Sequence, residues 1–194
     1  MGDDTTGGPI EGADGKLRCP WAGASEEYMA YHDTEWGRPV HDEQGLYERL
    51  MLEAFQSGLS WLTILRKRDG IRDAFALFVP EHVAAFTADD IERLMVDTRI
   101  IRNRQKINAA ITNAQATIAL RENGGLDSLI WSFAPQPSPA PKTVHEVPSI
   151  TPESTALSKA LKKVGFVFVG PTTAYAAMQA IGVVNDHLAD CHVR

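Results

Sequence analysis

The sequence lacks several features that would place the protein in a specialised class. It contains only two cysteines among 194 residues, which excludes a disulfide-rich secreted scaffold. No run approaches the roughly 18 to 20 apolar residues of a membrane span. The N-terminal segment has neither the basic nor the apolar region of a signal peptide. We therefore expect a soluble, cytoplasmic protein with no membrane partner.

An excess of positive charge is also missing. The chain has 19 basic and 25 acidic side chains, a formal net charge of −6. Because nonspecific affinity for nucleic acid comes mainly from phosphate neutralisation, this balance argues against a protein that coats DNA or RNA, although it allows a local basic face. Hydrophobic residues make up 44% and charged residues 23% of the chain, which is typical of one globular domain.

The pattern along the chain predicts an all-α domain. Residues 1–16 are rich in glycine and acids and poor in apolar side chains, which predicts a disordered extension before a single domain at residues 17–194. The four residues 166–169 resemble a strand but have no partner strand. Apolar periodicity, capping residues and stop signals predict helices over 42–57, 60–67 or beyond, 80–86, 91–96, 104–121, 151–164 and 172–181.

Each cysteine has a histidine at a spacing that suits metal binding. His32 follows Cys19 with twelve residues between them, and His187 precedes Cys191 with three between them. On a helix, the second spacing would put both side chains on one face. The four residues have the composition of a closed structural zinc site, which would fasten the N-terminal segment to a C-terminal helix. Two buried thiols or a disulfide are the alternatives, and the acids beside the histidines could orient the imidazoles: Asp33 and Asp186.

Glu53 is unusual within the predicted helix at 42–57, because its carboxylate lies on or beside the apolar stripe. A buried carboxylate needs partners, so Glu53 either bonds backbone amides or accepts hydrogen bonds from a ligand. Several aromatic residues lie near Glu53 in the sequence. Such aromatic-rich segments more often belong to a hydrophobic core, but together with one acid they also suit a flat, positively charged ligand. The nearby rings are Trp21, Tyr28, Tyr31, Trp36 and Trp61.

Several segments, in chain order, resemble the type I 3-methyladenine DNA glycosylases. They are RCPW (18–21), AYHDTEWGRP (30–39), LYERLMLEAFQSGLSWLTILRKR (46–68), IIRNRQKINAAITNA (100–114), SKALKKVGFVFVGPTTAYAAMQAIGVVNDH (158–187) and Cys191. The resemblance covers about residues 17–191. It implies a helix-hairpin-helix DNA glycosylase fold, with N- and C-terminal segments joined at a zinc site, and alkylated double-stranded DNA as substrate.

The same resemblance implies roles for individual residues. The Zn²⁺ ligands would be Cys19, His32, His187 and Cys191. The catalytic acid of the base pocket would be Glu53, and the base-binding rings would be Tyr31, Trp61 and Trp21. A hairpin at 97–106 would grip phosphates, with Leu59 filling the gap left by an extruded nucleotide and basic contacts from Arg102, Arg104 and Lys106. Two hairpin positions depart from the glycines common in the family: Arg99 and Gln105.

The implied activity is excision of 3-methyladenine in base-excision repair, by a monomeric, monofunctional enzyme that leaves an abasic site. Methylation at N3 makes the base cationic and weakens the glycosidic bond, so little acid catalysis is needed. We expect Tyr31 and Trp61 to hold the cation between them while Glu53 chiefly recognises its amino edge. A noncatalytic binder of damaged DNA and a zinc hydrolase are the alternatives, and a closed set of four ligands argues against the hydrolase.

Overall fold

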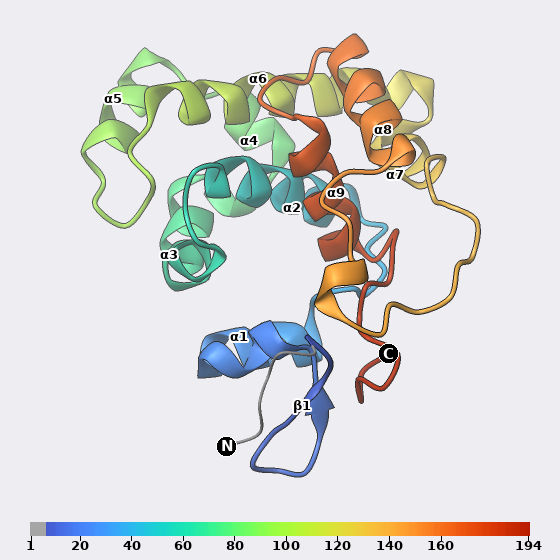
Figure 1. Ribbon diagram of the computed structural model, residues 1–194. Helices are drawn as coiled ribbons and strands as arrows, with labels where there is room; N and C mark the ends of the chain where they lie inside the picture. The colour runs from blue at the N-terminus through green and yellow to red at the C-terminus, as the bar shows by residue number, and fades with distance from the viewer. Residues whose placement is uncertain (1–6) are drawn as a thin grey trace.

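The computed structural model describes residues 7–194, and these residues are mainly helical (Figure 1). No helix in this range is long and apolar enough to cross a membrane. The elements are β1 (Ile10–Glu11), β2 (Leu17–Arg18), η1 (Pro20–Ala24), α1 (Glu26–Thr34), α2 (Glu43–Gln56), α3 (Trp61–Ala74), η2 (Ala76–Phe78), α4 (Pro80–Ala84), α5 (Ala88–Val96), α6 (Arg104–Leu120), η3 (Arg121–Asn123), α7 (Gly125–Trp131), η4 (Val144–Glu146), α8 (Pro152–Lys163) and α9 (Pro171–Ile181).

Helix α2 lies at the centre of the core. Its side chains are buried around most of its circumference, including Leu46, Leu50 and Phe55, and it packs against α3, α6, α7 and α9. Around it, α4 packs on α6 and α8 packs on α9. Figure 1 shows α1 and β1 beneath this group of helices, close to the C-terminal segment. The N-terminal elements β1 and α1 therefore lie beside the C-terminal segment below α2.

Local capping explains where most helices begin. Asp42 accepts a hydrogen bond from the Gly45 backbone N–H at 2.7 Å and starts α2. Thr87 and Asp90 form a capping box at α5, which begins at Ala88, three residues before the predicted start at 91. At α8, Thr151 is the N-cap and Pro152 occupies the first turn. The predicted starts of the helices at 42–57 and 151–164 are confirmed.

The N-terminal segment differs from the prediction of disorder. Residues 10–11 pair antiparallel with residues 17–18, and the Arg18 guanidinium bonds both carboxylate oxygens of Asp14 at 2.7 and 2.8 Å. The turn and this ion pair give residues 10–18 a local hairpin where disorder was expected, and the domain boundary at residue 17 stays a prediction. Residues 1–6 of the predicted extension lie outside the described part of the chain.

Two helices were not predicted. Helix α1 begins at Ser25, whose hydroxyl accepts a hydrogen bond from the Tyr28 N–H. Helix α7 begins at Gly125 directly after Gly124, which has a left-handed φ of 93°, so the glycine pair ends one helical segment and starts the next. The strand-like residues 166–169 form no strand and instead make an irregular loop between α8 and α9.

Candidate functional site

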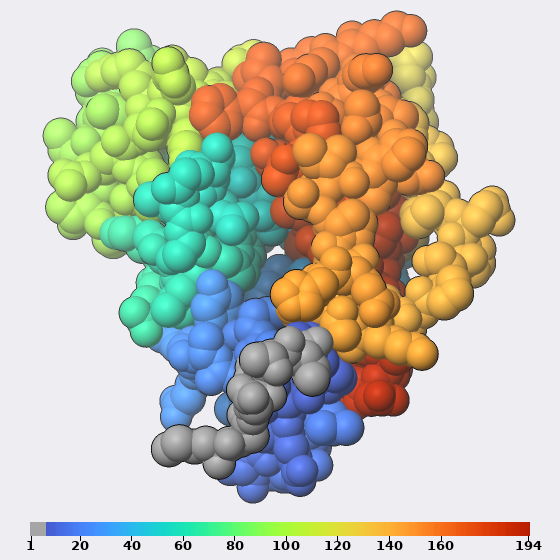
Figure 2. Space-filling view, viewed as in Figure 1, coloured from blue at the N-terminus to red at the C-terminus, as the bar shows by residue number. Residues whose placement is uncertain are grey.

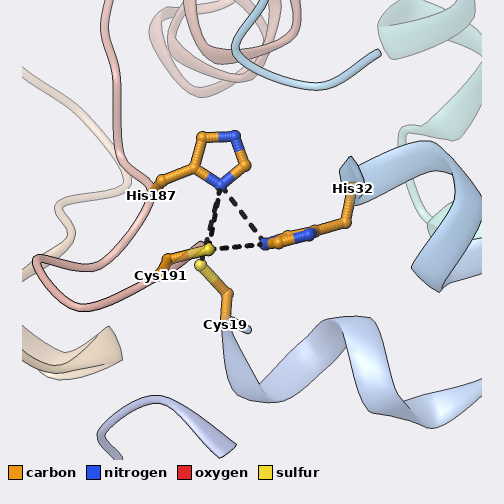
Figure 3. Close-up of side chains that lie close together, drawn as sticks. All are labelled: Cys19, His32, His187 and Cys191. Atoms are coloured by element: carbon orange, nitrogen blue, oxygen red, sulfur yellow. Dashed lines mark hydrogen bonds between the residues drawn. The ribbon is translucent and has the colours of Figure 1, made fainter. Parts of the chain in front are cut away.

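The two predicted Cys and His pairs come together at one buried point (Figure 3). The ligand atoms of Cys19, His32, His187 and Cys191 all lie within 4.8 Å of one another. His187 Nδ1 is 3.2 Å from His32 Nε2, 3.7 Å from Cys191 Sγ and 4.0 Å from Cys19 Sγ. Tetrahedral zinc, with bonds of about 2.0 to 2.3 Å, needs ligand separations of about 3.3 to 3.8 Å. The donor set therefore fits a four-coordinate metal ion.

The backbone positions these donors from both ends of the domain. Cys19 is the N-cap of η1 and His32 lies on α1. His187 and Cys191 lie in the irregular segment after α9, so the expected helical turn between them is wrong. Instead, the Cys191 N–H donates to the Leu188 carbonyl at 2.9 Å, closing a turn that brings the thiol back to the cluster.

Each imidazole is oriented through its outer nitrogen. His32 Nδ1 is 2.8 Å from Asp33 Oδ1, and His187 Nε2 is 3.0 Å from the Trp36 carbonyl oxygen. Each ring thus turns its other nitrogen to the cluster, the arrangement that metal-binding histidines adopt. Asp186 does not orient His187, because its carboxylate accepts from the Tyr175 hydroxyl and the Gln179 amide: 2.6 and 2.8 Å.

Burial also favours the metal-binding form of the histidines. It lowers the pKa of His32 below its usual value and that of His187 to about 4, so both imidazoles stay neutral near pH 7. Burial raises the pKa of the Cys19 thiol to about 12. A thiolate at this position therefore needs a cation beside it, as a bound metal would provide.

A pocket of about 590 Å³ opens beside this cluster. Figure 2 shows the surface hollowed where the blue, teal and orange segments meet. Two pocket residues pack directly on the clustered histidines: the Trp21 ring centroid is 5.1 Å from His32, and the Trp36 centroid is 4.6 Å from His187. The Cys and His cluster thus supports one wall of the pocket. The lining residues include Trp21, Tyr28, Tyr31, Trp36, Glu53, Gln56, Trp61, Gln179 and Asp186.

Glu53 of α2 contributes a buried carboxyl group to this pocket. Glu53 is only 7% exposed, and burial raises the pKa of its carboxyl group to about 8. Within residues 7–194 no hydrogen bond or ion pair reaches its carboxyl group, so the alternative in which Glu53 bonds backbone amides is not seen. A buried acid without a protein partner is a site for a ligand that donates hydrogen bonds or carries positive charge.

The aromatic rings differ from the expected open sandwich. The Tyr31 and Trp61 centroids are 5.3 Å apart with planes tilted by 50°, whereas a flat base between two rings needs about 7 Å, twice a contact of about 3.5 Å. The rings therefore make one continuous wall, and a base would lie against that wall unless Trp61 moves. The indole N–H of Trp61 is buried and has no hydrogen-bond partner among the residues described.

The predicted DNA-contacting residues lie in the turn after α2 and around the start of α6. Leu59 is exposed in the turn between α2 and α3, where Gly58 has φ +80°. In residues 7–194, Arg102 is exposed and no carboxylate pairs with it. Arg104 makes an exposed bidentate pair with Glu92 at 2.8 and 2.9 Å, a type of pair that contributes little to stability and exchanges easily.

Lys106 has a different position from the one expected. It is 7% exposed, and its ammonium donates to the carbonyl oxygens of Phe55 and Ser57 at 2.8 and 2.6 Å. The structure gives it a structural role, capping the carboxyl end of α2, in place of the expected contact with phosphate. Arg99, at one of the positions that depart from the family pattern, is bound to Asp73 and Asp97.

Two pocket residues, Gln56 and Gln179, were not singled out from the sequence, and Asp186 was singled out only as a partner of a histidine. Gln56 lies one helical turn after Glu53, so its i, i+3 spacing was an available signal. Gln179 and Asp186 reach the pocket only because α9 and the following segment pack there, and no local pattern predicts that.

Comparison with known proteins identifies the family. A family model described as methyladenine glycosylase matches residues 21–194. The chain belongs to the methyladenine glycosylase family. The resemblance drawn from the sequence motifs is thereby confirmed. Among characterised members of this family, the DNA-3-methyladenine glycosylase of Haemophilus influenzae is 48% identical over 178 residues, which cover 90% of this chain and 96% of that protein. DNA-3-methyladenine glycosylase 1 of Escherichia coli is also 48% identical over 178 residues, covering 90% and 95%.

Solved structures of this family have the same fold. A crystal structure of 3-methyladenine DNA glycosylase I has a TM-score of 0.86 and 47% identity, covering 90% of this chain and 98% of that one. A Staphylococcus aureus structure that describes the basis of 3-methyladenine recognition has a TM-score of 0.86 and 36% identity, covering 91% and 95%. The helical fold is therefore that of the methyladenine glycosylases.

Proposed function

We propose that this protein hydrolyses the N-glycosidic bond of 3-methyladenine in alkylated double-stranded DNA, releasing the free base and leaving an abasic site. The observation that carries the proposal is the unpartnered carboxyl group of Glu53, buried in a pocket walled by Tyr31 and Trp61. Relatives 48% identical to this chain are named for this activity. A related glycosylase has been described in complex with 3-methyladenine.

The reaction requires little acid catalysis from the protein. The methylated base carries a positive charge before the bond breaks, so the electron pair of the glycosidic bond moves into the ring and the base leaves neutral. Water adds to the anomeric carbon of the sugar, and its proton passes to solvent. The protein must extrude the nucleotide, hold the base and stabilise charge near the reacting bond.

Glu53 recognises the positive charge of the methylated base. With a pKa of about 8, it is largely protonated near pH 7 in the absence of a ligand. A cation in the pocket favours the carboxylate, so binding of the methylated base is coupled to loss of that proton. The ionised Glu53 then accepts hydrogen bonds from the amino edge of the base. Ordinary adenine is neutral and gains neither this attraction nor the cation–π contact with the Tyr31 and Trp61 wall.

Zn²⁺ is the metal that suits the Cys19, His32, His187 and Cys191 cluster, and its role is structural. The four protein donors would fill the coordination positions of a bound Zn²⁺ and would leave none for a reacting water. Because Trp21 and Trp36 pack on the clustered histidines, metal binding holds one wall of the pocket. We assign the metal no step in the reaction.

The loops beside the pocket hold the duplex. The exposed side chain of Leu59 would enter the space left by the extruded nucleotide, while Arg102 and Arg104 bind phosphates, Arg104 by exchanging its exposed pair with Glu92. We further propose that the protein works as a monomer in the cytoplasm.

Release of free bases from N-methylated duplex DNA tests the proposal, with 3-methyladenine and 7-methylguanine separated by chromatography. We expect 3-methyladenine release, and a loss of about 100-fold in rate for Glu53→Gln. The matched control is Glu48→Gln, on the same helix, because Glu48 is also buried but is bonded to Arg72 at 2.7 Å. Folded, metal-loaded wild-type protein that binds alkylated duplex without releasing a base would instead indicate a noncatalytic damage binder.

A further inference from the structure

Two valines in and beside η4 line the pocket that we assign to the base. Val144 and Val147 are both pocket residues, and both are half-buried. They pack in the same apolar cluster as Trp21 and Trp36, against the buried Leu188. The apolar part of this wall therefore depends on where η4 is held.

The connector that leads into η4 provides little packing of its own. Residues 134–139 are all exposed. The Ala189 N–H donates to the Pro141 carbonyl at 2.8 Å, which fixes the entry to the turn. The Lys142 N–H donates to the Glu146 carboxylate at 2.9 Å, which shapes the turn. These bonds do not hold the two valines in the pocket wall.

The N-terminal segment contacts η4 through Gly7. Gly7 is buried, and its carbonyl accepts a hydrogen bond from the Val144 N–H at 2.8 Å. A methyl group on Gly7 would lie 3.0 Å from the His145 ring and 3.1 Å from a Val144 methyl group, which is tighter than ordinary van der Waals contact. Gly7 also has φ +61°, a conformation that favours glycine. Both the close approach and the backbone therefore require glycine here.

The hairpin at residues 10–18 anchors this contact to the rest of the site. The buried Arg18 guanidinium bonds Asp14 at 2.7 and 2.8 Å and Asp33 of α1 at 2.8 to 3.1 Å. The Leu17 carbonyl accepts a hydrogen bond from the His192 N–H at 2.9 Å. Figure 2 shows the blue N-terminal atoms against the orange atoms of the region that includes η4. Because the hairpin is fixed to α1 and to the C-terminal segment, it can hold η4 in place.

We propose that residues 7–18 are part of the base site, as a latch that holds η4 so that Val144 and Val147 close the pocket against water. Residues 7–18 precede the part of the chain that matches the family. The inference rests on the proposed function, because the methylated base is the ligand of this pocket.

The latch affects recognition in two ways. An apolar wall that excludes water strengthens the attraction between a cationic base and the Glu53 carboxylate, since charges interact more strongly away from water. The wall also limits the size of the base that fits. Gly7 touches no reacting atom, so it is a positioning residue.

Gly7→Ala tests the latch. Binding of free 3-methyladenine, measured by calorimetry, should be about fivefold weaker. At saturating N-methylated duplex, the ratio of 3-methyladenine to 7-methylguanine release should fall about fivefold, because a loosened wall admits the larger base. Hydrogen exchange at the Val144 amide should become faster, since the amide loses its acceptor. Zinc content should stay at the wild-type value.

Gly15→Ala is the matched control. Gly15 lies in the same segment and is also left-handed at φ +73°, but the nearest atom that a methyl group would meet is Glu11 Oε1, at 3.9 Å. This substitution adds backbone strain without touching η4, so base binding and selectivity should stay near wild type. Val147→Ala is a second test that leaves the N-terminal segment intact. Its loss of two methyl groups from the wall should weaken base binding about tenfold.

The outcomes separate this inference from the proposed activity. Base affinity and selectivity of Gly7→Ala equal to those of wild type would overturn the latch, as would an equal loss in Gly15→Ala or unchanged binding by Val147→Ala. Wild-type protein that binds 3-methyladenine in a Gly7-dependent manner but releases no base would support the latch and overturn the hydrolysis. Protein that neither binds nor releases the base would overturn both.

Discussion

Replacing Glu53 with glutamine should make the protein more stable and less active, by an amount that depends on pH. Burial raises the pKa of Glu53 from its ordinary 4.5 to about 8, so between these values the folded protein keeps a proton that the unfolded chain releases. The native state binds more protons across this window, and the free energy of unfolding therefore falls as pH rises. Glutamine has nearly the same shape, is always neutral and removes that dependence.

The size of the effect follows from the two pKa values. Linkage gives a destabilisation by Glu53 of about 1 kcal/mol near pH 5.5 and about 4 kcal/mol near pH 8.5. Glu53→Gln should therefore raise the free energy of unfolding, and its advantage over wild type should grow by about 3 kcal/mol across this range.

Urea unfolding followed by tryptophan fluorescence, with metal present throughout, measures this difference. Glu48→Gln is the control, because losing the 2.7 Å bond to Arg72 should destabilise the protein at every pH tested. A Glu53→Gln advantage that does not grow with pH would refute the reasoning, and so would a variant less stable than wild type near pH 8.5. Either result would mean that Glu53 has a partner in the folded protein.

Three further outcomes are expected. At protein concentrations below saturation, single-turnover release of 3-methyladenine should rise with pH through about 8, as Glu53 of the free protein ionises, and level off above that value; an unchanged profile in Glu53→Gln would contradict this assignment. Cys191→Ser should lose the bound zinc, measured by elemental analysis, and lower the melting temperature by about 10 °C; retention of one zinc per chain would rule out Cys191 as a ligand. Trp61→Ala should weaken binding of free 3-methyladenine about tenfold in calorimetry, and equal affinity would remove Trp61 from the base-binding wall.

Helix starts could be predicted from the sequence where the signal is local. Asp42, Thr87 and Thr151 cap their helices through their own side chains, and a residue three positions away completes each interaction. Helix α1 could not be predicted from an apolar stripe, because it buries Tyr31 and His32, whose neighbours are the pocket and the Cys and His cluster. The residues that α1 buries therefore face the functional site and not the hydrophobic core, so they follow no apolar stripe.

The identities of the site residues were easier to predict than their geometry. Spacing and family resemblance brought Cys19, His32, His187 and Cys191 together, and the structure places their donors at one point. The contact between Tyr31 and Trp61 depends on how α1 meets α3, which no local pattern encodes. Lys106 was misassigned for the same reason: its spacing suits a basic hairpin, but the carboxyl end of α2 packs against it and takes its hydrogen bonds.

The Cys and His cluster makes the assembly of the pocket depend on the order of synthesis. Cys19 and His32 leave the ribosome early, while His187 and Cys191 follow about 150 residues later, long after α2 and α3 are available to fold. Since Trp21 and Trp36 pack on clustered histidines from both ends, the pocket wall is complete only when translation has passed Cys191. In a partly synthesised chain the pocket is incomplete and Glu53 is open to water. The protein should therefore excise no base until translation has passed Cys191.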